Sequence, residues 1–105
     1  MIKSKSQFIR VECDVTIDHI HQGASYRLWL HGQNCGDQLI TERTWYHTKH
    51  HYVTESLQLQ LSPGAYSVSV HKVKPCKSKF TLSNYKVKIG NGRFINNSAT
   101  FEVSA

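Results

Sequence analysis

The segment from residue 57 to residue 73 constrains the fold more than any other part of the chain. Apolar and polar residues alternate over 57–61 and again over 66–71. Successive side chains of a strand point to opposite faces, so each run presents one apolar face to a core and one polar face to water. Pro63 and Gly64 lie between the runs and favour either a tight reversal or a corner where the chain passes from one sheet to another. The segment therefore predicts two half-buried strands joined by a short turn.

The residues at this turn resemble a feature of known sandwich folds. Pro63 and Gly64, followed by Tyr66 at the start of the next strand, are similar to the tyrosine corner of immunoglobulin-like and fibronectin-type domains. The resemblance implies two packed sheets that the corner connects. An ordinary tight hairpin, with Tyr66 as a core residue, is the alternative that the same residues allow.

A second partial resemblance involves Cys13 and Trp29. Their spacing is similar to that of the first cysteine and the core tryptophan of an immunoglobulin domain. Val68 stands two residues after the corner tyrosine, where the second cysteine would be, so the disulfide between the sheets is absent. Trp29 alternates with Leu28 and Leu30, which places it on the nominally polar face of its strand.

Alternation of the same kind predicts strands along the whole chain. They lie at 9–17, 25–31, 38–46, 52–61, 65–73, 80–89 and 93–103, the last interrupted at 96–98. The pattern of 38–46 is mixed, because Leu39 and Trp45 share one face and Ile40 and Tyr46 share the other. Such a pattern indicates an edge strand or a strand with a bulge. Gly90-Asn91-Gly92 has the composition of a hairpin turn. No segment keeps a helical period, so we expect essentially no helix.

Length and patterning together predict the architecture. A chain of 105 residues fits one domain. Short strands with turn signals at regular intervals are typical of a sandwich or a barrel. We expect an all-β protein, a seven- to eight-stranded antiparallel β-sandwich of the immunoglobulin/fibronectin-III-like type. Residues 7–105 form its single domain, and residues 1–6 form a basic, disordered lead-in.

Cysteine usage and hydropathy indicate where the protein resides. Three cysteines without C-x-x-C spacing do not make a disulfide framework. The first residues lack the apolar stretch of a signal peptide, and no run approaches the roughly 20 apolar residues of a membrane span. We therefore expect reduced thiols, a cytoplasmic location and no membrane contact. Cys13 lies on the apolar face of strand 9–17, which predicts an inert core thiol.

Charge is the clearest functional signal in the sequence. Thirteen Lys and Arg stand against seven Asp and Glu, and the net charge of +6 favours anionic partners. Residues 72–93 contain seven basic residues and no acidic one. The residues predicted to bind a partner are Lys72, Lys74, Lys77, Lys79, Lys86, Lys88, Arg93, His47, Lys49, His50, Trp29 and Arg27.

This pattern leaves more than one function open. The main expectation is a small, non-enzymatic binding module whose basic surface engages an acidic protein. Nucleic acid is the alternative partner, because lysines neutralise phosphates and neighbouring aromatic rings stack on bases. A third alternative is a homodimer or structural subunit that pairs through an edge strand such as 38–46. Lysines that only cover solvated faces and protect strand edges are the simplest explanation.

No motif indicates catalysis, a metal or a cofactor. The seven histidines match no known ligand spacing, so we expect no native metal site. Serine, histidine and aspartate are present without a nucleophile elbow, a P-loop or a metalloprotease motif, so we expect no enzyme activity and no cofactor. An activated thiol at Cys35 or Cys76, next to a histidine in a cleft, would be the exception.

Overall fold

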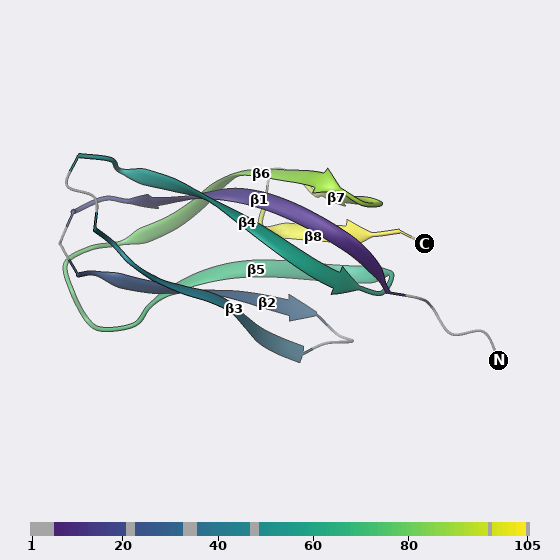
Figure 1. The fold of residues 1–105 in the computed structure, drawn as a ribbon, viewed down its shortest axis with the longest axis horizontal. Coiled ribbons are helices and arrows are strands. Elements are labelled where there is room, and N and C mark those ends of the chain that lie inside the picture. Colours follow the sequence, from purple (N-terminus) through teal and green to yellow (C-terminus); the bar gives the residue numbers. More distant parts are fainter. Residues whose placement is uncertain (1–5, 21–22, 33–35, 47–48, 97, 105) are drawn as a thin grey trace.

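The computed structural model describes residues 6–20, 23–32, 36–46, 49–96 and 98–104. This part of the chain forms eight strands and no helix (Figure 1). The strands are β1 (Gln7–Ile17), β2 (Ser25–Gly32), β3 (Gly36–Thr44), β4 (Tyr52–Leu61), β5 (Gly64–Lys72), β6 (Phe80–Ile89), β7 (Gly92–Phe94) and β8 (Thr100–Val103). The described residues therefore include no helix that could cross a membrane. Of the predicted lead-in, residues 1–5 lie outside the described part.

The strands form two antiparallel sheets that pack face to face. One sheet has the order β4-β1-β6 and the other has the order β3-β2-β5-β8-β7. Figure 1 shows β4, β1 and β6 in one layer over β3, β2 and β5 in the other. This arrangement confirms the predicted all-β sandwich. In the strand letters of immunoglobulin domains, β1 and β4 take the places of B and E, while β3, β2, β5 and β8 take those of C′, C, F and G. β6 departs from that scheme, because it lies beside β1 at the place of strand A.

Strict alternation creates the core between the sheets. Every second residue of β1, from Ile9 to Ile17, is buried, and so are the three leucines of β4. Cys13 belongs to this buried row, as predicted. Burial raises the pKa of its thiol to about 12, and the nearby carboxylate of Glu55 adds to the effect. The thiolate is the reactive form, so Cys13 is an inert part of the core.

The connection from β4 to β5 is a corner between the two sheets. β4 belongs to the three-stranded sheet and β5 to the five-stranded sheet. The hydroxyl group of Tyr66 donates a hydrogen bond to the carbonyl oxygen of Ser62 over 2.6 Å. A tyrosine that bonds back to the backbone a few residues upstream is the defining contact of a tyrosine corner. The corner, rather than the tight hairpin, is therefore correct.

The third strand differs from its prediction in bounds and faces. The pattern predicts a strand at 38–46 with Leu39 and Trp45 on one face, but β3 ends at Thr44. Leu39 is 49% exposed, whereas Trp45 is 2% exposed. The pairing of β2 with β3 shifts register between Leu28 and Trp29, and such a bulge reverses the faces beyond it. β3 pairs only with β2, so the predicted edge position and bulge are both confirmed.

The predicted hairpin at Gly90-Asn91-Gly92 is wrong. β6 and β7, which flank these residues, lie in different sheets, so the turn carries the chain across the sandwich. Gly90 has a φ of 104°, and a Cβ atom there would lie 2.7 Å from the carbonyl oxygen of Phe8. The glycine is needed because the turn passes directly against β1, a contact that local composition does not reveal.

Candidate binding surface

Three loops meet at one end of the sandwich, at the left of Figure 1. They connect β1 to β2, β3 to β4 and β5 to β6. Because these three strand pairs all reverse at the same end, segments far apart in sequence become neighbours. We call the described residues of these loops, 18–20, 23–24, 45–46, 49–51 and 72–79, the loop end. In an immunoglobulin variable domain, the loops after strands B and F lie at the corresponding end.

Backbone hydrogen bonds tie the three loops together. The amide of Asp18 donates to the carbonyl oxygen of Lys79 over 3.1 Å, and the amide of Lys79 donates to Oδ1 of Asp18 over 2.8 Å. The amide of Trp45 donates to the carbonyl oxygen of Ala24 over 2.7 Å. These bonds join the first loop to both of the others, so the loop end has a defined backbone rather than three independent loops.

A cluster of aromatic rings packs between the two sheets, next to the loop end. The ring of Phe80 lies 5.0 Å from that of Tyr26 and 6.2 Å from that of Trp45, measured between centroids. Trp45 and Tyr26 are buried, as is Ser78, whose hydroxyl group donates to the carbonyl oxygen of His19. Packing against these rings restricts the conformations of the adjacent loops. Loops that are already ordered lose less conformational entropy if they bind a partner.

The loop end is strongly basic. Its three segments contain five lysines, all exposed, and a single carboxylate. The lysines are Lys49, Lys72, Lys74, Lys77 and Lys79. The hydrogen bond from the Lys79 amide holds the pKa of Asp18 below its usual value, so this carboxylate is charged at neutral pH but already has a partner. No ion pair joins these lysines to a carboxylate among the described residues.

A groove of about 510 Å³ runs between the first and third loops. Asp18, His19, Ile20, Lys72, Cys76, Lys77 and Lys79 line it. Nζ of Lys72 donates to the carbonyl oxygen of Cys76 over 2.7 Å, which positions the ammonium group at the groove. Lys77 and Lys79 are free to meet an anionic group that enters. Cys76 and His19 share this groove, but the thiol of Cys76 has its hydrogen bond with the carbonyl oxygen of Ser78, at 3.9 Å.

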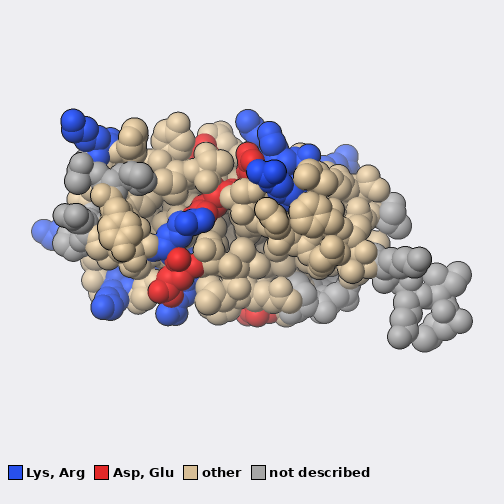
Figure 2. Space-filling model, viewed as in Figure 1, with Lys and Arg blue, Asp and Glu red and all other residues tan. Residues whose placement is uncertain are grey.

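The other predicted basic residues lie elsewhere. Lys86 is opposite Glu12 in the β1–β6 ladder and helps to lower the pKa of Asp14, so acidic neighbours offset its charge. Lys88 lies on the same strand and the same outer face. Arg93 is opposite Glu102 on the outer face of the other sheet. Figure 2 shows basic side chains at the left end of the molecule and a further basic group near its upper middle, next to acidic side chains.

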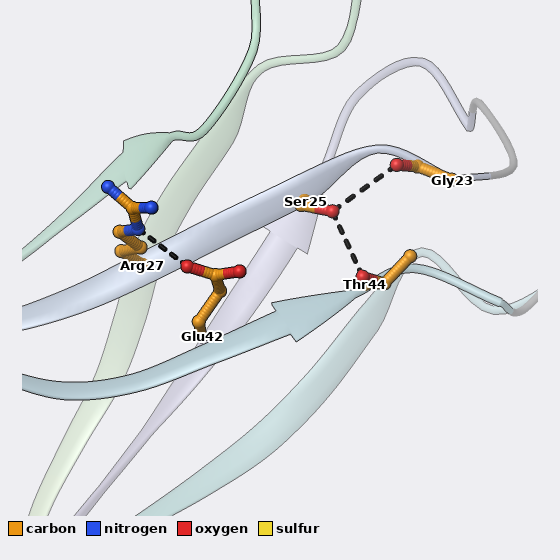
Figure 3. A network of polar contacts seen from close by, with 5 residues as sticks. All are labelled: Gly23, Ser25, Arg27, Glu42 and Thr44. Atoms are coloured by element: carbon orange, nitrogen blue, oxygen red, sulfur yellow. Dashed lines mark hydrogen bonds and ion pairs between the residues drawn. The ribbon is translucent and has the colours of Figure 1, made fainter.

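Arg27 and Trp29 lie on the outer face of the five-stranded sheet. Nε of Arg27 donates to Oε1 of Glu42 over 2.6 Å, so this arginine has its counter-ion on β3 (Figure 3). The same close-up shows Ser25 joining Gly23 and Thr44 at the start of β2. Trp29 is half-buried, as its position on the polar face predicts. His50 belongs to the loop end, and His47 lies outside the described residues.

A buried carboxylate beside the loop end has no counterpart in the expectations from sequence. Glu55 of β4 is 3% exposed and accepts hydrogen bonds from the hydroxyl group of Tyr26 and from Nε of Arg43. It faces an open pocket of about 610 Å³ between the edges of β3 and β4. The signal was present in the sequence, because Glu55 is in phase with the three inward leucines of its strand.

Comparisons with known proteins add no family. No protein family model, curated protein or solved structure matches this chain. Among the described residues, no group of three or more His, Cys, Asp or Glu side chains is placed to hold a metal ion. The function therefore has to be inferred from the geometry of the chain itself.

Proposed function

We propose that this protein is a small, non-enzymatic binding module that engages an acidic protein through its loop end. The observation that carries the proposal is the gathering of five exposed lysines at the loop end, from the loops at 45–51 and 72–79. Three of them, Lys72, Lys77 and Lys79, line a groove with a single and already bonded carboxylate. The matching position of binding loops in immunoglobulin variable domains supports it by fold-level analogy. The free thiols of Cys13 and Cys76 are consistent with a reducing, cytoplasmic setting, which is part of the proposal.

The shape of the basic surface favours a protein over a nucleic acid. The sandwich is only 21 × 20 Å across its two shorter axes, and the lysines of the loop end cluster on that narrow end. Proteins that bind nucleic acid without sequence preference usually follow the phosphates along a groove or stripe. A basic stripe along the length of the sandwich would need residues such as Lys86 and Arg93. These two instead lie opposite Glu12 and Glu102 on the neighbouring strands. An acidic patch or peptide fits a compact basic end better.

Nucleic acid is the second candidate, and one observation favours it. Tyr46 and Tyr52 are exposed at or next to the loop end, where their rings could stack on bases. Self-association through the strand at 38–46 is less well supported. β3 is an edge strand, but its bulge and the charges of Asp37, Glu42 and Arg43 are features that hinder edge-to-edge pairing.

Two charge-reversed double variants of equal charge test the proposal. Lys77→Glu/Lys79→Glu changes the groove, and Lys86→Glu/Lys88→Glu makes the same change in net charge on β6. Each variant and the wild type is used to recover partners from lysate, with and without nuclease, and affinities for the recovered partner are then measured. We expect the groove variant to lose roughly tenfold or more in affinity, because each like-charge contact it creates opposes binding, while the β6 variant stays within about threefold.

The outcomes separate the candidates. A partner that survives nuclease and loses affinity only with the groove variant supports the acidic-protein proposal. Recovery that disappears with nuclease, together with a steep decrease of affinity with salt, assigns the loop end to nucleic acid instead. Equal losses in both double variants would mean that only net charge matters, and the loop end would then not be the binding site.

A further inference from the structure

A row of hydrogen-bonded polar side chains crosses the outer face of the five-stranded sheet. Nδ1 of His31, on β2, lies 2.7 Å from Oδ1 of Asp37 on β3. Nε2 of the same histidine lies 2.6 Å from Oγ of Ser69 on β5. Nε2 of His71, also on β5, lies 3.1 Å from that oxygen. Two histidines, from β2 and β5, therefore meet at the hydroxyl group of Ser69, and Asp37 of β3 bonds to the far nitrogen of one of them.

With Asp37 ionised and both imidazoles neutral, the chemistry of these groups gives one consistent set of donors and acceptors. An ionised carboxylate can only accept, so Nδ1 of a neutral His31 must carry the proton and donate to Asp37. Nε2 of His31 is then an acceptor, and the hydroxyl group of Ser69 donates to it. The lone pairs of the same oxygen then accept from His71 in the tautomer that carries its proton on Nε2. The Ser69 proton thus points at a base whose tautomer a carboxylate sets.

This is the relation of nucleophile, base and orienting acid that activates serine in hydrolytic enzymes. Paired strands hold it in place: β2 lies between β3 and β5, and His31 is directly opposite Asp37 in the ladder. Trp29 is the register partner of Ser69 and offers a half-buried apolar surface beside the hydroxyl group. Ser69 and His31 are 38 residues apart, so no sequence motif marks the site.

We infer that Ser69 is an activated nucleophile that accepts an acyl or phosphonyl group from an activated ester. The oxygen of Ser69 would form a bond to the carbonyl carbon of the ester, while the hydroxyl proton passes to Nε2 of His31. The N–H of His71 would turn from that oxygen to the carbonyl oxygen as it gains negative charge. The bond to the leaving alkoxide or phenolate then breaks, and the proton on His31 passes to the leaving oxygen.

Water completes the cycle on the open sheet face. A water molecule would attack the acyl-Ser69 carbonyl carbon, give its proton to His31 and release the carboxylic acid, while Ser69 regains its hydroxyl proton. The inference goes beyond the binding function proposed above, because it adds chemistry that a non-enzymatic module lacks. It uses the outer face of the five-stranded sheet rather than the groove of the loop end. Turnover at Ser69 would end the non-enzymatic part of the proposed function, whereas binding at the loop end is tested separately.

A fluorophosphonate probe tests the nucleophile on the full-length chain. The probe forms a phosphorus–oxygen bond with an activated serine and releases fluoride, and peptide mass spectrometry locates the adduct. We expect labelling of Ser69 in the wild type and in Ser67→Ala, which removes a hydroxyl group from the same face of β5. Ser69→Ala should take no label. His31→Gln should label at least about tenfold more slowly, because a general base contributes about 10²–10⁴ to rates in enzymes.

Asp37 is a positioning residue that orients the imidazole of His31. Its variants show whether it sets the tautomer of His31 or only packs against the ring. Asp37→Asn can donate to Nδ1 and so favours the wrong tautomer of His31. Asp37 is 72% exposed, so we expect a smaller decrease than for His31→Gln, several-fold in labelling rate. Asp37→Glu keeps the accepting carboxylate and should recover part of the rate.

Three results would overturn the inference. They are a wild type that takes no label at Ser69, a label that persists at full rate in His31→Gln, and equal rates for Asp37→Asn and the wild type. Release of p-nitrophenolate from p-nitrophenyl acetate gives a second reading. A burst of about one equivalent in the wild type, absent in Ser69→Ala, supports an acyl-serine. A burst that Ser69→Ala retains comes from other nucleophiles, such as lysines, and contradicts it.

Discussion

At the scale of single residues, two arginine–glutamate pairs show how burial sets the value of an ion pair. Arg43 meets Glu55 at 2.5 Å, and Arg27 meets Glu42 at 2.6 Å, so the geometries are almost the same. Glu55 is 3% exposed, however, while Glu42 is 47% exposed. A buried carboxylate that loses its partner stays desolvated, whereas an exposed one returns to water.

The same substitution at both arginines measures this difference. Arg43→Met should lower the free energy of unfolding by about 2 kcal/mol, less than the 3–5 kcal/mol of a fully buried pair, because the arginine itself is largely exposed. Arg27→Met should cost roughly 0.5 kcal/mol or less. Urea unfolding of both variants measures the two values. Equal costs would show that the hydroxyl group of Tyr26 alone is enough to stabilise Glu55.

At the scale of elements, the connections decide how the strands are arranged. The turn from β6 to β7 moves the chain between sheets and lies against β1, where the amide of Asn91 donates to the side chain of Gln7 over 3.2 Å. Gly90 in this turn and Gly23 before β2 both have positive φ angles, of 104° and 93°. They differ in their surroundings, since a Cβ atom at Gly23 would meet nothing within 4 Å.

Alanine at these two glycines separates backbone strain from steric contact. Gly23→Ala should cost about 1–2 kcal/mol of stability, the strain of a left-handed conformation alone. Gly90→Ala should cost more, about 3 kcal/mol in total, because its Cβ would also press on the backbone of β1. Thermal or urea unfolding gives both numbers. If Gly90→Ala is no worse than Gly23→Ala, the crossing turn is free to move away from β1.

At the scale of the whole molecule, the net charge is positive, and protonation of carboxylates in acid makes it more so. Asp14 lies on the outer face of β1 and accepts hydrogen bonds from Asn84 of β6 and Thr54 of β4, so one carboxylate bridges the three strands of its sheet. The bond from Asn84, followed by that from Thr54, lowers the pKa of Asp14. The amide of Lys79 does the same for Asp18.

These two carboxylates predict a loss of stability in acid. Because their pKa values are lower in the folded state than the ordinary 3.8, their stabilisation is complete above that value and is lost as the pH falls through the folded values. The free energy of unfolding should therefore decrease below about pH 4. Asp14→Asn should be less stable than the wild type at neutral pH and should show a shallower decrease between pH 4 and 2.5. A variant with the same slope as the wild type would show that other carboxylates control acid unfolding.

The sequence by itself determined the strands, the two-layer class and most of the core. Alternation with a period of two is a local property, so strand 9–17 and the leucines of 57–61 could be placed without knowing their partners. The corner at Pro63, Gly64 and Tyr66 was also readable, because one side chain bonds to backbone only four residues away. Where alternation failed, as at Leu39 and Trp45, the cause was a bulge that depends on a neighbouring strand.

Only the tertiary structure decided which charged and polar side chains lie next to one another. Strand order and direction bring three loops to one end and join Lys72, Lys77 and Lys79 to His19, while register gives Lys86 and Arg93 acidic partners. Likewise, Asp37, His31 and Ser69 meet only because β3, β2 and β5 are neighbours with a particular register. Contacts between residues distant in sequence depend on the packing of the whole chain, and no local pattern of residues encodes them.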